Sequence, residues 1–173
     1  MSETRPLDDA TRALLRHTVA TLAYRAAKVV RDVPPEFGAF RATVVGRTAL
    51  DLLSHMVDLM AWGERFAHGE YRWEPGTVAD WPTAVEVFFA RLAAFDAALA
   101  DTTLSSYPAG VMFQGPIADA LTHVGQLALL RGMAAVPVRP ESYARATIEA
   151  GRVGLEQAPP GREFDGDASR RRP

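Results

Sequence analysis

Histidine and aspartate side chains offer the clearest chemistry in this 173-residue chain, which has four histidines and no cysteine. Asp119 and His123 are four residues apart, so on a helix they share one face about one turn apart. His55 lies in another segment with helical periodicity. If those two helices are neighbours in a bundle, His55, Asp119 and His123 converge as two nitrogen ligands and one carboxylate for a divalent metal ion. Further coordination positions stay open for water or substrate.

The spacing of Asp119 and His123 also has simpler explanations. Such pairs arise by chance, and an internal histidine is often a hydrogen-bonded core residue. Asp119 stands between two alanines, and burying an unpaired carboxylate is costly, so it needs a cation, an arginine or a helix N-terminus as partner. A position about one turn inside a helix start would stabilise the carboxylate through the helix dipole alone.

Three polar side chains have the spacing to orient the candidate ligands. Asp51 and Asp58 lie four residues before and three after His55, and Gln126 lies three residues after His123. Each could hold an imidazole in a fixed orientation. Solvated surface carboxylates are the alternative for both aspartates.

Aromatic residues and the other histidines are weaker candidates. Trp62 and Trp73 could line a pocket mouth, although tryptophans in bundles more often belong to the core. His17 and Tyr24 are two turns apart and could face the same cavity. His68 precedes a glycine at a predicted helix end, where an imidazolium suits the dipole, so we expect a structural role for it.

Apolar residues at three- and four-residue spacing predict four helices, which indicates an all-α four-helix bundle with a long crossover. Pro34 and Pro35 end the first helix, and Gly115 with Pro116 opens the fourth. The segment 69–81 is long enough to carry the chain across a domain. The predicted helices cover residues 9–31, 43–68, 82–100 and 115–135.

The C-terminal part differs in composition from the bundle. We expect a four-helix bundle domain over residues 1–138. Residues 139–173 are expected to form an irregular extension that packs on the bundle or is partly mobile. Glu141 to Glu149 could form a short helix within it.

Composition argues against two classes of partner. The net charge is -2, and the only basic run, Arg170 to Arg172, is at the chain end, so nucleic-acid binding is not expected. The N-terminal residues are polar, and no stretch approaches about 18 uninterrupted apolar residues, so neither export nor membrane spanning is expected. A cytoplasmic location is the default expectation.

Two segments resemble the DinB-like superfamily of four-helix bundles. The run from Gly115 to Val138 resembles its last bundle helix, in which an H-x-x-x-H motif precedes G-Q and then L-R. The run from Asp51 to Trp62 resembles its second helix, in which a lone histidine precedes a tryptophan by two turns. With the number and order of helices, the resemblance covers about residues 14–138.

The resemblance implies a bundle with a long crossover, a homodimer and a divalent ion bound by three histidines. Matched position by position, the lone histidine is His55 and the histidine before G-Q is His123. The remaining histidine of the motif is replaced by Asp119. A carboxylate hardens the site and favours zinc, iron(II) or manganese, with nickel also a candidate, or it marks a relative that has lost its metal.

Two functions follow from these expectations. The first is a metal-dependent enzyme that acts on a small-molecule substrate, either as a hydrolase or by transferring a low-molecular-weight thiol, as the resemblance implies. The chain itself supplies no cysteine nucleophile. The second is a non-catalytic dimeric bundle or small-molecule-binding module, in which Asp119 and His123 form a buried hydrogen-bonded pair.

Overall fold

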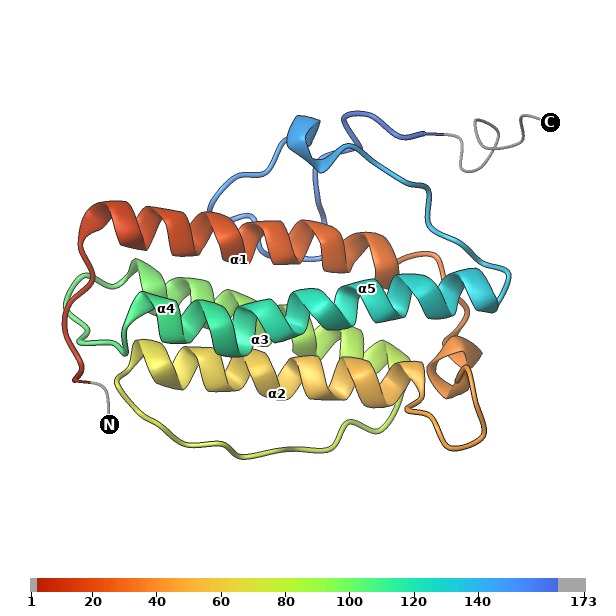
Figure 1. Ribbon diagram of the computed structural model, residues 1–173, viewed down its shortest axis with the longest axis horizontal. Helices are drawn as coiled ribbons and strands as arrows, with labels where there is room; N and C mark the ends of the chain where they lie inside the picture. The colour runs from red at the N-terminus through yellow and green to blue at the C-terminus, as the bar shows by residue number, and fades with distance from the viewer. Residues whose placement is uncertain (1–2, 165–173) are drawn as a thin grey trace.

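A computed structural model describes residues 3–164, and within that range the protein is all-α. Four long helical rods pack around one core, as the apolar periodicity predicts (Figure 1). The long helices are α1 (Asp9–Val30), α2 (Ala49–Ala67), α3 (Trp81–Ala100) and α5 (Ala118–Met133). The shorter elements are η1 (Pro35–Ala39), α4 (Ala109–Met112), η2 (Phe113–Ile117) and η3 (Tyr143–Arg145).

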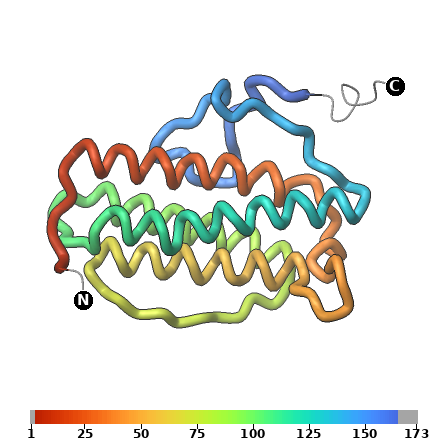
Figure 2. The backbone as a smooth tube through the Cα atoms, in the orientation of Figure 1, coloured from red at the N-terminus to blue at the C-terminus, as the bar shows by residue number. Residues whose placement is uncertain are grey.

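The helices form a four-membered ring in which α2 packs on both α3 and α5, and α1 packs on both as well. Following the colours in Figure 1, α1 and α5 run in one direction while α2 and α3 run in the other. Because α2 and α3 are parallel, the connection between them returns along the whole length of α2 (Figure 2). This connection, residues 68–80, is the predicted long crossover. The predicted contact between the second and fourth helices is also present, as α2 against α5.

Side-chain caps set where the helices begin. Asp8 accepts a hydrogen bond from the backbone of Thr11 at the start of α1, and Asp80 does the same for Thr83 at the start of α3. Each cap satisfies a backbone N–H that has no partner inside the helix. The first and third helices therefore begin within one residue of the predicted positions.

The second helix begins six residues later than predicted. Thr48 and Asp51 form a capping box, in which each side chain accepts a hydrogen bond from the other residue's backbone N–H, at 3.0 and 2.8 Å. Helix α2 therefore starts at Ala49. The residues from Thr43 form a turn instead, closed by the bond from Gly46 N–H to the carbonyl of Thr43. Val45, a predicted core position, is 96% exposed.

The fourth helix begins earlier than predicted, at Ala109, so Pro116 is not its first residue. Pro116 lies inside η2, a π-helical turn that joins α4 to α5. Proline has no N–H to donate and its ring crowds the preceding turn, so it is poorly tolerated within a regular α-helix. The wider π turn, a rare form that occurs mostly as single turns inside α-helices, accommodates the proline here.

Close approach of two helices depends on a glycine in α2. A Cβ atom at Gly63 would lie 2.7 Å from the Phe95 ring of α3, closer than two such atoms can come.

Helices α1 and α3 are joined by a bidentate ion pair from Arg16 to the buried Asp96, at 2.9 and 3.0 Å. Arg131 of α5 is buried and donates to carbonyls at the end of α1, including that of Arg31 at 2.8 Å.

The C-terminal segment packs across α1 through a buried polar cluster. Lys28 contacts Glu141 at 2.7 Å and Glu163 at 2.6 Å, and Tyr24 donates its hydroxyl to Glu141 at 2.7 Å. Burial and this hydrogen bond raise the pKa of Tyr24 above its usual range. The helix predicted from Glu141 is wrong: only the 3-10 turn η3 forms there, because Glu141 is part of this cluster and an isolated bridge to Glu163.

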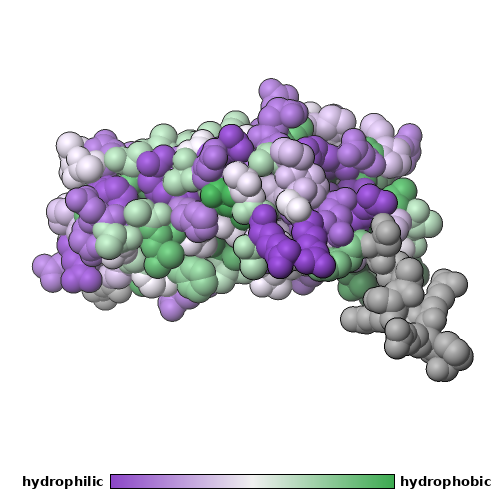
Figure 3. Space-filling view, turned by 90° about the horizontal axis from the view of Figure 1, so that it is seen from above, coloured by the Kyte–Doolittle hydropathy of each residue, from purple (hydrophilic) through white to green (hydrophobic). Residues whose placement is uncertain are grey.

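The face that carries this segment has polar residues throughout, with small apolar patches between them (Figure 3). Within residues 3–164, no helix combines the length and hydropathy that crossing a membrane requires. The basic run from Arg170 to Arg172 lies outside the described residues.

We predict that the attachment of the C-terminal segment weakens in acid. The hydrogen bond and charge of Lys28 hold the pKa of Glu163 below its usual range of about 4.3. A carboxylate with a lowered pKa stabilises the fold above that range, and this stabilisation is lost as the pH falls through the folded-state pKa. Glu163→Gln should therefore cost about 1 kcal/mol of unfolding free energy at pH 7 and nothing near about pH 2. Urea unfolding at both pH values measures this, with the exposed Glu156→Gln as control. An equal loss at both pH values would contradict the prediction.

Candidate metal centre

The structure brings the three predicted ligands together between α2 and α5. Asp119 lies between the two imidazoles, with Oδ2 3.3 Å from His55 Nε2 and Oδ1 3.3 Å from His123 Nε2. The two imidazole rings are 5.0 Å apart and nearly perpendicular. One ligand atom from each residue fits within 4.8 Å of the others, so the group could hold a metal ion.

The donor set and its spacing suit a small divalent cation. Nitrogen and carboxylate oxygen bind zinc at about 2.0–2.1 Å, so two such atoms at a tetrahedral angle lie about 3.4 Å apart. Both contacts of Asp119 have nearly that length, at 3.3 Å. The two contacts are made by different oxygens, and one ligand atom from each residue lies within 4.8 Å of the others. Side-chain movement around an ion would bring two nitrogens and one oxygen together, the pattern that suits zinc, iron(II), manganese or nickel.

Gln126 fixes the orientation of His123. Its amide oxygen is 2.7 Å from His123 Nδ1, and since that oxygen is an acceptor, Nδ1 carries the proton. In the neutral imidazole, Nε2 then has a free lone pair that faces the Asp119 carboxylate. Two acceptors in contact repel each other unless a proton or a cation lies between them. The predicted orienting role of Gln126 is consistent with this contact.

The backbone positions the three ligands in different ways. His55 lies in the middle of α2, and Asp119 and His123 occupy the first turns of α5. The π-helical turn η2 immediately precedes Asp119. Exposure falls from 45% for the Asp119 side chain to 25% for His55 and 9% for His123, so the group opens to solvent on the side of the aspartate.

Aromatic rings from the crossover cover the group. Trp73 packs edge-on against His55, with ring centres 5.7 Å apart, and against Trp62, at 5.5 Å. Trp73 is 41% exposed, and Tyr71 also packs on Trp62 at 5.9 Å. Trp73 therefore lies beside the candidate ligand His55 and Trp62 packs against Trp73, where the sequence left a pocket mouth and a core position as alternatives.

Arg65 holds Trp73 in that place. Its guanidinium donates to the carbonyl of Arg72 at 3.3 Å and to the carboxylate of Glu74 at 2.6 Å, the residues on either side of Trp73. Residues 70–78 form neither helix nor strand, so these contacts are important for the path of the chain. The sequence did not single out Arg65, because no pattern relates it to residues seven and nine positions later.

The two aspartates predicted to orient His55 accept hydrogen bonds from backbone N–H groups instead. Asp51 forms the capping box of α2, and the hydrogen bond from the backbone of Thr48 holds the pKa of Asp51 below its usual range. Asp58 accepts a hydrogen bond from Gly76 N–H at 2.9 Å and so fastens the crossover to α2. Their role is to stabilise the scaffold around His55.

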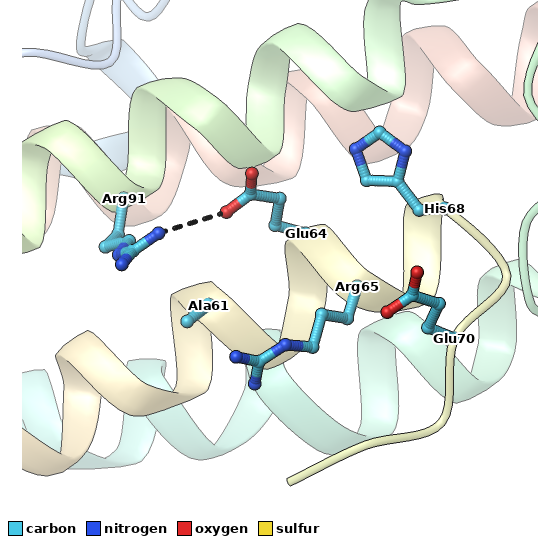
Figure 4. A pocket seen from close by; sticks show the side chains of 6 residues that line it. All are labelled: Ala61, Glu64, Arg65, His68, Glu70 and Arg91. Atoms are coloured by element: carbon cyan, nitrogen blue, oxygen red, sulfur yellow. Dashed lines mark ion pairs between the residues drawn. The ribbon is translucent and has the colours of Figure 1, made fainter. Parts of the chain in front are cut away.

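The other two histidines lie away from the group. His17 is exposed on α1 while Tyr24 is buried, so the expectation that they face one cavity is wrong. His68 follows the last residue of α2, about 20 Å along the helix from His55. It lines a pocket of about 160 Å³ with Glu64, Arg65 and other charged residues (Figure 4). Its place at the helix end agrees with the structural role predicted for it.

The fold and site thus define a helical bundle with a candidate metal centre. Comparison with protein-family models, curated proteins and solved structures finds no match. Among residues 3–164, His55, Asp119 and His123 are the group of histidine and carboxylate side chains that meets the geometric requirement for an ion.

We predict that Arg65→Met frees Trp73 from its position over the site. The substitution keeps most of the side-chain length but removes both contacts that flank the tryptophan. Acrylamide should then quench tryptophan fluorescence more strongly in a Trp81→Phe background, in which Trp62 and Trp73 are the remaining tryptophans. Because the Arg65–Glu74 pair is partly exposed, stability should change by no more than about 1 kcal/mol. Arg91→Met, which removes another arginine of the same pocket, is the control. Equal quenching in both variants would contradict the role of Arg65.

Proposed function

We propose that the protein binds one divalent metal ion through His55, Asp119 and His123 and is a metal-dependent enzyme acting on a small-molecule substrate. The observation that carries the proposal is the contact between Gln126 and His123, at 2.7 Å. It leaves the Nε2 lone pair of a neutral imidazole facing a carboxylate, an arrangement that a cation stabilises. Hydrogen bonding of the second imidazole nitrogen is a regular feature of metal-ligating histidines.

Each residue of the site has a separate task in this proposal. The two imidazoles and the carboxylate hold the ion, and Gln126 keeps His123 in the correct tautomer. The partial exposure of Asp119 leaves the ion within reach of substrate. Trp73 and Trp62 form an apolar wall beside His55 that excludes water from one side.

The bound ion supplies Lewis-acid chemistry, which activates either water for hydrolysis or an added low-molecular-weight thiol for transfer to an electrophile. The chain has no cysteine, so a thiol nucleophile must come with the substrate. The likeness of its second and fourth helices to those of DinB-like proteins supports membership of that superfamily. The superfamily includes both hydrolases and thiol transferases. Hydrolysis needs only water, so it is the first reaction to test.

We predict that a divalent metal raises stability through these three residues. At a hundred times its dissociation constant, the ion should add about 2.7 kcal/mol. For a chain of this size that is a rise in Tm of about 5–11 °C. Alanine at His55, Asp119 or His123 should abolish the rise, and Gln126→Leu should weaken metal binding by about 10–100-fold. Elemental analysis and melting with Zn, Mn, Fe(II) and Ni measure the effect.

A matched control comes from the exposed histidine of α1. His17→Ala removes an imidazole without touching the group, so the Tm rise should be unchanged. Asp119→His should retain binding, since it supplies a third imidazole at the same position. If no divalent ion moves the Tm of the parent protein, Asp119 and His123 form a simple ion pair and the metal proposal is wrong.

We predict that activity, once a substrate is found, depends on the same ion. Activated esters and amides in water test hydrolysis, and electrophiles with added thiols test transfer. Chelation should remove the activity, re-addition of metal should restore it, and His123→Ala should reduce it to the rate without enzyme. His17→Ala should retain it. Turnover that survives both demetallation and His123→Ala would place the chemistry elsewhere in the chain.

A further inference from the structure

Trp62 has a buried hydrogen-bond donor without an acceptor. Its indole N–H is inaccessible to solvent, and no protein atom among residues 3–164 accepts a hydrogen bond from it. Leaving such a donor unsatisfied costs about 1–3 kcal/mol, so buried donors normally have a partner. The donor is therefore a candidate for binding a group that comes from outside the chain.

The position of Trp62 places this donor next to the candidate metal centre. Trp62 is seven residues after His55 on α2, so the two lie on the same face about 10 Å apart along the axis. The far edge of the indole six-membered ring rests on η2, where a Cβ at Gly115 would lie 3.3 Å from Cζ3. Nε1 belongs to the five-membered ring, at the other end of the indole from that edge.

A flat ring already occupies the space between the two sites. The Trp73 indole contacts His55 on one side and Trp62 on the other, at 5.7 and 5.5 Å between ring centres. Trp73 belongs to the crossover and is 41% exposed, so a ligand can replace it if the crossover moves. We call the space that the Trp73 ring fills between His55 and Trp62 the slot; without that ring, it would accept another planar aromatic group.

We propose that this slot binds a small planar carboxylic acid that carries a carbonyl oxygen at its far end. The carboxylate binds the metal ion, the flat body takes the place of the Trp73 ring, and the carbonyl accepts the Trp62 N–H. The proposal rests on the proposed function, because the ion holds one end of the ligand. It specifies the chemical class of the ligand and gives Trp62 a role in ligand selectivity.

Two probes of matched shape test the hydrogen bond. In 4-acetamidobenzoate a carboxylate and an amide carbonyl lie at opposite ends of a benzene ring, while 4-propylbenzoate has the same length without the carbonyl. Titration calorimetry with zinc-loaded protein should show that the first binds about 5–10-fold more tightly. Trp62→Phe should remove this preference but leave the affinity for zinc within about twofold. Trp81→Phe, at the start of α3, should retain the preference.

Two further measurements keep the result clear if Trp62→Phe does not fold. In the parent protein, the indole proton resonance of Trp62 should move downfield with 4-acetamidobenzoate and not with 4-propylbenzoate. Trp73→Phe and Trp81→Phe assign that resonance by elimination, since the chain has three tryptophans. Arg65→Met should tighten binding of both probes, because less work is needed to move Trp73.

The outcomes separate this inference from the function on which it rests. Equal affinity for the two probes in zinc-loaded parent protein overturns the role of Trp62 and leaves the metal site intact. In that case the indole N–H is satisfied by the faces of neighbouring rings. Failure to bind any of zinc, manganese, iron(II) and nickel overturns both proposals, since no ion then holds the carboxylate.

Discussion

The contact of one carboxylate with two imidazoles sets the main constraint on this fold. Asp119 reaches His55 with one oxygen and His123 with the other, so α2 and α5 must be neighbours in a fixed register. With α2 and α3 parallel, the chain between them has to run back along the bundle (Figure 2). That return path carries Trp73 against His55, so the aromatic contact on this side of the site is a consequence of the topology.

Departures from regular structure gather around the same place. The π-helical turn with Pro116 directly precedes Asp119, and Gly115 in that turn receives the Trp62 ring. The Trp62 indole N–H is buried without an acceptor. Each feature is locally unfavourable, while the core of the bundle is regular and well packed. Locally unfavourable features of this kind beside candidate ligands are typical of functional sites.

Periodicity predicted the four helices and placed Asp119 and His123 on one helix face, because both follow from the 3.6-residue helical repeat. Their meeting with His55 was conditional on the second and fourth helices being neighbours, and the packing of α2 on α5 meets that condition. Periodicity failed where a single side chain decided the outcome. The capping box of Thr48 moved the start of α2, although the apolar pattern continued through Val45. Contacts between distant segments, such as Tyr24 with Glu141, have no signature in local spacing, so the path of the C-terminal segment could not be predicted.

The aspartate at position 119 explains how the group keeps its geometry before an ion binds. A histidine there would offer one ring nitrogen toward the site and could not contact both other imidazoles at once. The two oxygens of Asp119 do so, at 3.3 Å each. A shared proton can stabilise these contacts when no cation is bound, so the three side chains stay together. An aspartate at position 119 thus forms a bridge that preorganises the two imidazoles.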